Sequence, residues 1–227
     1  MALSNKTKAG IIKLTKFYSF IYKSLSSLFK KLYRVEIIGA ENEPENGPFI
    51  VCANHLSNHD VVLLAACLKH QVRYLAKAEL FKIPLLKQLI TALGAFPVDR
   101  KKGDVAAIKK MIQLIEDGEV IGVFPQGHRF PKVHPATTPV KHGAGLVACK
   151  TKATILPVAI ENKKMKLGFF RKTVLKIGKP IEFSEFGEIP SNKSGYELVT
   201  GEVFAKICAM VEYPALPASD TEDKGTK

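Results

Sequence analysis

The sequence lacks any cysteine pattern typical of a metal site or of a disulfide framework. Its cysteines are far apart, and none belongs to a CxxC pair or to a Cys/His ligand spacing: Cys52, Cys67, Cys149 and Cys208. Each stands among apolar residues, which is typical of small core side chains in a reducing compartment. No zinc site or other metal site is therefore expected.

Acidic residues are also scarce. Lys and Arg number 34 against 21 Asp and Glu, so the formal net charge is +13. A surface of this sign attracts anions such as nucleic acid, anionic lipid or phosphorylated substrates. Nucleic-acid binding is not expected, because the sequence contains no helix-turn-helix, zinc or RNP pattern.

Long apolar runs are missing as well. No stretch approaches the roughly 18 consecutive apolar residues that suggest a membrane-spanning helix. A signal peptide is not expected either, because lysines interrupt the apolar part of the first segment and no small-residue cleavage site follows. The chain is therefore expected to have no spanning helix.

Residues 1–34 contain eight Lys and Arg and no acidic residue. Their apolar residues recur at three- and four-residue steps: Ile11, Leu14, Tyr18, Ile21, Leu25, Leu28 and Leu32. A basic helix with such a stripe is typical of segments that lie in a membrane interface. The alternative is that the stripe packs on the protein's own core and the lysines are solvated. We predict an amphipathic arm over 1–34 that contacts an anionic membrane surface.

The rest of the chain has the composition of a folded domain, with 46% hydrophobic and 24% charged residues overall. Short apolar runs that predict strands alternate with longer runs that predict helices, which favours an α/β fold. The sheet should be largely parallel or mixed, with helices on both faces. The domain should cover 35–213, and 214–227 should form a flexible polar tail. Strands are predicted at 35–38, 49–53, 72–76, 120–124, 155–160 and 174–177, and the last helix at 197–213.

The stretch NHLSNHD, from Asn54 to Asp60, lies between the predicted strand 49–53 and an apolar helix. It places His55 and Asp60 in a strand-to-helix turn, where α/β folds commonly bind ligands. A carboxylate five positions after an imidazole can orient it as a base and stabilise the imidazolium. The alternatives are that Asp60 only caps the helix and that His59 is the base.

Four segments in this order resemble the glycerolipid acyltransferases, most closely the bacterial 1-acyl-sn-glycerol-3-phosphate acyltransferases of the PlsC type. NHxSxxD matches residues 54–60, and GxxPxxR matches Gly94 to Arg100. The third block, usually FPEGTRS, reads FPQGHRF over residues 124–130, and an apolar strand with a proline follows at 155–160. The resemblance covers roughly residues 30–212 and implies the fold of the glycerol-3-phosphate acyltransferases.

The resemblance implies roles for individual residues. His55 is the base and Asp60 orients it. Arg100 and Arg129 bind the acceptor's phosphate, with Lys101 and Lys102 as candidate auxiliaries. The expected substrate-binding residues also include Ser57, whose hydroxyl is expected to brace the turn, and Pro125, Gln126 and Gly127 of the third block. The block departs from the family pattern at Gln126 and His128, where Glu and Thr are usual.

The resemblance also implies an activity. The chain is expected to transfer an acyl group from acyl-CoA or acyl carrier protein to the 2-hydroxyl of lysophosphatidic acid, giving phosphatidic acid without a cofactor. The alternatives are another lysolipid acceptor, such as a lyso-aminolipid, and a non-catalytic peripheral membrane protein on the same fold. A basic, aromatic stretch at 163–172 is expected to contact membrane or carrier protein, or to be a solvated loop. The protein should lie peripherally on the cytoplasmic side of the cell membrane.

Overall fold

The computed structural model describes residues 26–92, 94–98 and 104–212. Most of the predicted arm, Arg100 with Lys101 and Lys102, and the predicted tail lie outside the described residues.

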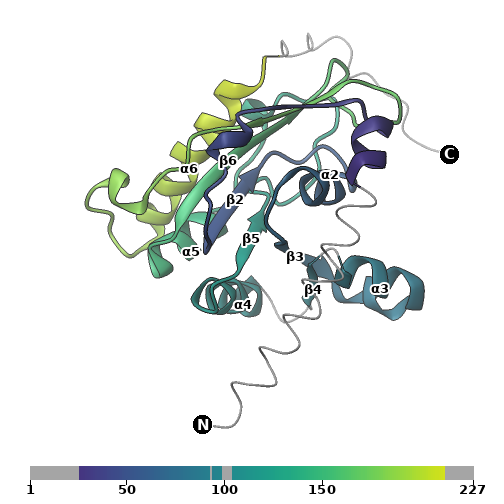
Figure 1. Ribbon diagram of the computed structural model, residues 1–227. Coiled ribbons are helices and arrows are strands. Elements are labelled where there is room, and N and C mark those ends of the chain that lie inside the picture. The colour runs from purple at the N-terminus through teal and green to yellow at the C-terminus, as the bar shows by residue number, and fades with distance from the viewer. Residues whose placement is uncertain (1–25, 93, 99–103, 213–227) are drawn as a thin grey trace, which may run out of the picture.

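One sheet of seven strands forms the centre of the molecule (Figure 1), in the order β1-β7-β6-β2-β5-β3-β4. All neighbouring strands run parallel except β6 and β7, which are antiparallel. The expected largely parallel or mixed sheet is therefore confirmed. The strands are β1 (Val35–Ile38), β2 (Phe49–Ala53), β3 (Val72–Lys77), β4 (Ala95–Val98), β5 (Val120–Val123), β6 (Thr154–Glu161) and β7 (Thr173–Ile177).

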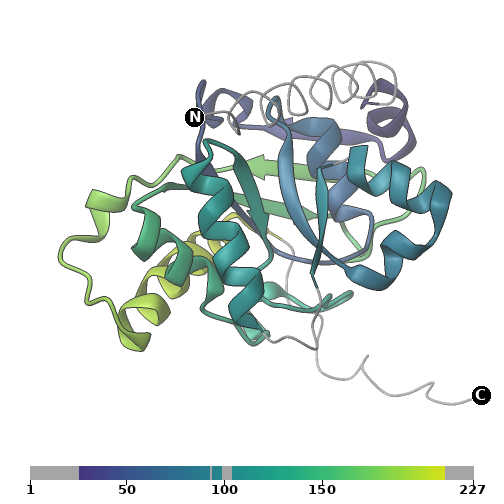
Figure 2. The same ribbon diagram turned by 90° about the horizontal axis from the view of Figure 1, so that it is seen from below.

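Helices cover both faces of this sheet, as expected (Figures 1 and 2). On one face α5 packs against α4 and α6, and α6 also contacts β6 and β2. On the opposite face lies α2, which connects β2 to β3. The helices are α2 (Asp60–Cys67), α3 (Pro84–Ala92), α4 (Asp104–Glu116), α5 (Gly143–Thr151) and α6 (Lys193–Met210).

Most strand ends lie within one residue of the sequence prediction, and two elements, one strand and one helix, differ by more. Strand β4 was not predicted, because its four residues contain Pro97 and coincide with the second family block. Helix α6 begins at Lys193 and not at residue 197, because the Asn192 side chain accepts the backbone N–H of Gly195 and caps an earlier turn.

The centre of the core is β2, which lies between β5 and β6. All five of its residues are buried, in agreement with an apolar, β-branched run covered on both faces. Its last residue, Ala53, pairs with Val158 of β6. The NHLSNHD turn therefore starts at the carboxyl end of the most deeply buried strand, where the backbone is held firmly.

The end of the predicted arm is helical over residues 26–32. Tyr33 is buried, and Phe29 and Leu32 pack against the core, while Leu28 is 57% exposed. This last turn of the arm therefore packs on the domain with one side only. Among the residues that the structure describes, no helix is both long enough and apolar enough to cross a membrane.

Candidate active site

Two loops meet at the carboxyl ends of neighbouring parallel strands. The NHLSNHD turn follows β2, and the segment Phe124 to Phe130 follows β5. Because Cys52 pairs with Val123 in the sheet, the two loops leave it side by side. The chain turns to opposite sides of the sheet after these two strands, which is where open α/β folds bind ligands.

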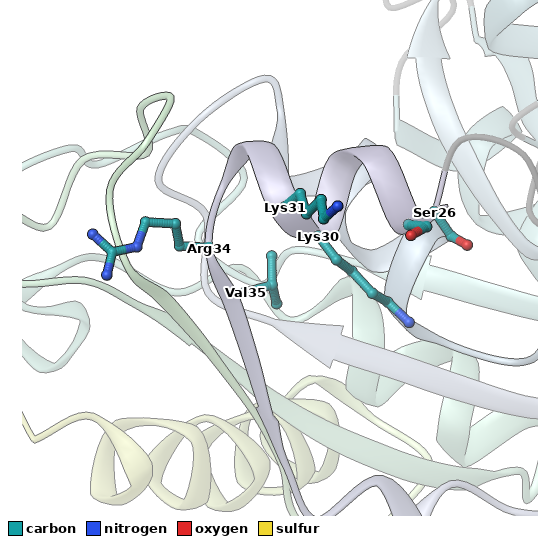
Figure 3. A pocket seen from close by; sticks show the side chains of 6 residues that line it. Ser26, Lys30, Lys31, Arg34 and Val35 are labelled. Atoms are coloured by element: carbon teal, nitrogen blue, oxygen red, sulfur yellow. The ribbon is translucent and has the colours of Figure 1, made fainter.

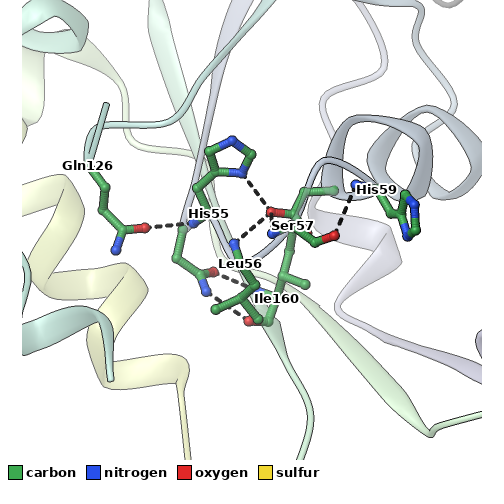
Figure 4. A network of polar contacts seen from close by, with 8 residues as sticks. His55, Leu56, Ser57, His59, Gln126 and Ile160 are labelled. Carbon is green, nitrogen blue, oxygen red and sulfur yellow. Dashed lines mark hydrogen bonds and ion pairs between the residues drawn. The ribbon is translucent and has the colours of Figure 1, made fainter. Parts of the chain in front are cut away.

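The His55 imidazole is held by the Asp60 carboxylate across this turn. His55 Nδ1 lies 2.6 Å from Asp60 Oδ2 (Figure 4). An ionised carboxylate only accepts hydrogen bonds, so Nδ1 carries the proton and Nε2 is left as an acceptor. The imidazole is 16% exposed, and in Figure 4 the other ring nitrogen points away from Asp60. The pair has the geometry of a general base with an orienting acid.

Asp60 is completely buried at the first position of α2. Its Oδ2 also accepts the backbone N–H groups of Leu56 and Ser57, at 2.7 and 2.8 Å. Burial raises the pKa of the Asp60 carboxyl, while the hydrogen bonds from His55 and from the two backbone groups oppose that rise. Asp60 thus shapes the turn and orients the imidazole, and the two roles do not exclude each other.

The ring of Phe124 lies against the imidazole of His55. Their centroids are 4.0 Å apart and their planes differ by 16°. Phe124 is stacked in turn on Tyr74 of β3. The stack fixes the plane of the imidazole, and its apolar surface keeps water from one side of the ring.

Asn54 anchors the start of the turn to β6. Its side chain is fully buried, with Nδ2 donating to the Ile160 carbonyl at 2.8 Å and Oδ1 accepting from the Ile160 N–H at 2.7 Å. These two bonds close the gap between β2 and β6 just before His55. The residue before the base is therefore as rigid as the sheet.

The third block holds the backbone of His55 from the other side. Gln126 Oε1 accepts the His55 N–H at 2.6 Å, and the Phe130 N–H donates to the His55 carbonyl at 2.8 Å. Pro125 and Gln126 are buried, whereas His128 and Arg129 are exposed. Of the predicted substrate-binding residues, Arg129 presents its cation to solvent and Gln126 faces the protein interior.

Gly127 has a left-handed backbone, with φ of 69°. The alkyl chain of Lys141 crosses it so closely that a Cβ would lie 2.8 Å from Lys141 Cδ. Lys141 N also donates to the Pro125 carbonyl at 2.7 Å. The left-handed backbone therefore favours glycine at 127, and a larger residue would displace the Lys141 side chain.

The side chains of Ser57 and His59 form hydrogen bonds outside the His55–Asp60 pair. Ser57 Oγ accepts the backbone N–H of His59 at 3.2 Å, which braces the turn. The Tyr33 hydroxyl, whose pKa is raised by burial and by Asp60, is hydrogen-bonded to His59 Nδ1 at 2.7 Å. His59 therefore joins the last turn of the arm to the catalytic turn, and of the two histidine side chains in that turn it is His55 that contacts the Asp60 carboxylate.

Sequence reasoning missed three residues near the site: Phe124, Thr138 and Lys141. Phe124 is the first residue of the third block, but its position beside the base depends on the pairing of β5 with β2, which the sequence does not show. Thr138 and Lys141 follow a short 3-10 helix, Pro135–Thr137, in a proline-bearing loop, and no sequence signal placed them beside Gln126 and Gly127. Within the described ranges, no three His, Cys, Asp or Glu side chains are grouped as metal ligands.

The chain matches the family model described as "Acyltransferase" over residues 34–161. It is 31% identical over 179 residues to the 1-acyl-sn-glycerol-3-phosphate acyltransferase of Bacillus subtilis, covering 78% of this chain and 88% of that one. The enzyme of the same name from Borreliella burgdorferi is 29% identical over 151 residues, and the match covers 66% of this chain and 58% of that protein.

A solved structure is also similar. It is the crystal structure of the 1-acyl-sn-glycerophosphate (LPA) acyltransferase PlsC from Thermotoga maritima, with a TM-score of 0.65 and 27% sequence identity. The match covers 93% of this chain and 83% of that one.

Proposed function

This chain belongs to the acyltransferase family, and from that premise we propose that it transfers a fatty acyl group from a thioester to the 2-hydroxyl of lysophosphatidic acid. The product is phosphatidic acid, and the reaction belongs to phospholipid biosynthesis. The relatives carry this activity in their names. The observation that carries the proposal is the 2.6 Å contact between His55 Nδ1 and Asp60 Oδ2, with the imidazole still within reach of solvent.

The chemistry needs one base and no covalent enzyme intermediate. Nε2 of His55 takes the proton of the lipid hydroxyl as its oxygen forms a bond to the thioester carbon. The carbon–sulfur bond then breaks, and the imidazolium returns the proton to the departing thiolate. Asp60 stabilises the imidazolium between these two steps, which is where a buried carboxylate contributes most.

The phosphate of the acceptor requires cations at a fixed distance from the base. Arg129 lies in the same loop as Gln126, which touches the His55 backbone, and its guanidinium suits phosphate oxygens. We assign Lys141, whose chain crosses Gly127, as a second cation for this phosphate. Arg100 keeps its proposed role by resemblance, although it lies outside the described residues.

The acceptor is an amphiphile, so the enzyme must meet it at a bilayer. The connection between β6 and β7 exposes two aromatic rings, Phe169 and Phe170, and five cations: Lys163, Lys164, Lys166, Arg171 and Lys172. Met165 and Leu167, which alternate with the lysines, are buried, so the loop is held with its charges outward. Basic residues beside exposed aromatic rings are typical of surfaces that bind anionic lipid.

This loop lies against the end of the arm. The Phe170 N–H donates to the Leu32 carbonyl at 2.6 Å, and Phe169 packs on Tyr33 and on His59. Lys30, Lys31 and Arg34 line a shallow hollow of about 430 Å³ on the same segment (Figure 3). Both basic elements therefore adjoin the catalytic turn, which suits a peripheral enzyme seated on the cytoplasmic face of the membrane.

The direct test is to incubate the purified protein with lysophosphatidic acid and, separately, acyl-CoA and acyl carrier protein thioester. Phosphatidic acid formed by wild type but not by His55→Ala is the expected result, and the donor that works identifies the thioester. No product from either donor overturns the proposal. Product formed only with a lyso-aminolipid would show that the acceptor belongs to that class. Equal amounts of product from wild type and His55→Ala would show that His55 is not the base.

The membrane contact has its own test. Flotation with vesicles containing about one-third anionic phospholipid should carry wild-type protein upward, and vesicles of phosphatidylcholine alone should carry less. Replacing Phe170, which is 74% exposed, with Ser should reduce flotation while leaving the melting temperature nearly unchanged. Undiminished flotation of this variant would limit the membrane contact to the arm.

A further inference from the structure

Gln126 occupies the position where the family pattern usually has glutamate, and its side chain is 2% exposed. Its amide makes two hydrogen bonds of opposite sense. Oε1 accepts from the backbone N–H of His55 at 2.6 Å, and Nε2 donates to Thr138 Oγ1 at 2.8 Å. The side chain therefore joins the catalytic turn to the loop that contains Thr138.

The direction of the second bond is fixed by Thr138 itself. A hydroxyl has one hydrogen, and here Thr138 Oγ1 donates it to the Pro135 carbonyl at 2.7 Å. The hydroxyl can then only accept from residue 126, so that residue must supply an N–H. Glutamine supplies it and an ionised glutamate does not.

An ionised carboxylate at position 126 would place an oxygen against the lone pairs of Thr138 Oγ1 at hydrogen-bond distance. Only a hydroxyl turned away from the Pro135 carbonyl would avoid this. The carboxylate would also place a negative charge at a position that is 2% exposed. Both effects disfavour glutamate at this position in this chain, although the two side chains have the same length.

The bond to His55 acts on the base through its backbone. The His55 N–H is held by Gln126 and its carbonyl by the Phe130 N–H, so the third block grips both sides of the residue. Asp60 then sets the rotation of the imidazole. The three contacts together fix where Nε2 points.

We propose that Gln126 is a positioning residue for His55 and that its uncharged amide is required by Thr138. The inference rests on the proposed acyl transfer but concerns how the base is held. It gives Gln126 a role distinct from binding of the acceptor. Glutamine at position 126, where the family pattern usually has glutamate, is then explained by its hydrogen bond to Thr138.

The test compares Gln126→Glu, Gln126→Ala, Thr138→Val and Thr138→Ser in the assay described above. Gln126→Ala should lower kcat by about 10- to 100-fold, because displacement of a base by a fraction of an ångström has effects of this size. The KM values for acceptor and donor should stay within about twofold. Thr138→Ser keeps the hydroxyl and should retain near wild-type kcat, whereas Thr138→Val should lose part of it.

A double-mutant cycle tests the pairing. Gln126→Glu should lower kcat less in a Thr138→Val background than in wild type, because the hydrogen bond between residues 126 and 138 is already absent there. Wild-type kcat in Gln126→Glu alone would overturn the requirement for an amide. A raised acceptor KM with unchanged kcat in Gln126→Ala would overturn positioning and favour contact with the acceptor.

Hydrogen exchange separates this inference from the proposed function. The amide hydrogen of His55 should exchange faster in Gln126→Ala than in wild type, while the amides of α6 should be unaffected. This measurement needs no substrate, so it stands if the acyl transfer is absent. Equal exchange of the His55 amide in both proteins would overturn the contact, and melting curves identify any variant that does not fold.

Discussion

One oxygen of Asp60 binds both the side chain of His55 and the backbone that follows it. Oδ2 contacts His55 Nδ1 at 2.6 Å and also accepts two backbone N–H groups. Among the described residues none donates to the other oxygen, Oδ1. A single oxygen atom of Asp60 therefore makes the hydrogen bonds both to the backbone of the turn and to the imidazole.

Asp60→Asn should lower kcat by about 10³- to 10⁴-fold, the size seen when the orienting carboxylate of a histidine base is made neutral. The amide can still accept from the backbone, so the turn should form, but the imidazolium loses its stabilising charge. Asp117→Asn, a surface substitution at the end of α4, is the matched control. Activity of Asp60→Asn within tenfold of wild type would rule out the orienting role.

The raised pKa of Asp60 also predicts a pH dependence of stability. Folding raises this pKa, so the folded state holds a proton that the unfolded state has released above pH of about 4. Stability contributed by Asp60 therefore falls as pH rises from there through the native pKa. Urea unfolding of wild type and Asp60→Asn at a series of pH values rising from about 4 should show the wild type losing stability relative to the variant. A wild-type free energy of unfolding that instead rises with pH relative to that of Asp60→Asn would contradict this prediction.

Arg129→Ala and Lys141→Ala should each raise the KM for lysophosphatidic acid by about 10-fold or more, with a smaller effect on kcat. The reason is that a charge-assisted contact to phosphate contributes about 1.5–3 kcal/mol. Lys193→Ala removes an exposed cation of α6 that pairs only with Glu197 among the described residues, and serves as the control. An unchanged KM in either variant would remove that residue from the phosphate site.

Two helical glycines should respond to alanine in opposite directions. A Cβ on Gly145 of α5 would lie 2.2 Å from the Tyr196 carbonyl of α6, so Gly145→Ala should destabilise by about 1–3 kcal/mol. Gly201 of α6 is exposed and has no described atom within 4 Å of such a Cβ, so Gly201→Ala should stabilise by about 0.5–1 kcal/mol. Thermal melting measures both, at about 2–4 °C per kcal/mol for a chain of this size.

Lys176→Met should destabilise the fold by about 3–5 kcal/mol, because it leaves Glu161 buried without its cation. Lys172→Met breaks an exposed pair with Glu36 and should cost at most about 1 kcal/mol. Burial lowers the pKa of Lys176, but Glu161 and Glu212 raise it by more, so the net shift is upward. The stabilisation by Lys176 is therefore complete at neutral pH and is lost as pH rises through that raised pKa. Urea unfolding at increasing alkaline pH should show a larger fall in the free energy of unfolding for Lys172→Met, which keeps Lys176, than for Lys176→Met.

The strands β2 and β6 could be predicted from sequence because apolar, β-branched runs buried on both faces leave a local pattern. The same holds for His55 and Asp60, whose spacing spans a single turn. Strand β4 left no such pattern, because it is short, contains Pro97 and lies at the edge of the sheet. The start of α6 depended on the Asn192 cap, a contact that apolar periodicity does not register.

The sequence by itself determined the alternation of strands and helices, the family and the pairing of His55 with Asp60, because each rests on residues close together in the chain. The tertiary structure decided that Phe124 stacks on the imidazole, that Gln126 holds the His55 backbone and that Thr138 requires an amide there. The physical reason is that the first two contacts join the loops after β2 and β5, which only the order of the strands in the sheet brings together, and the third joins two parts of the β5–α5 connection that lie 12 residues apart in the chain. Local sequence patterns carry no information about that order.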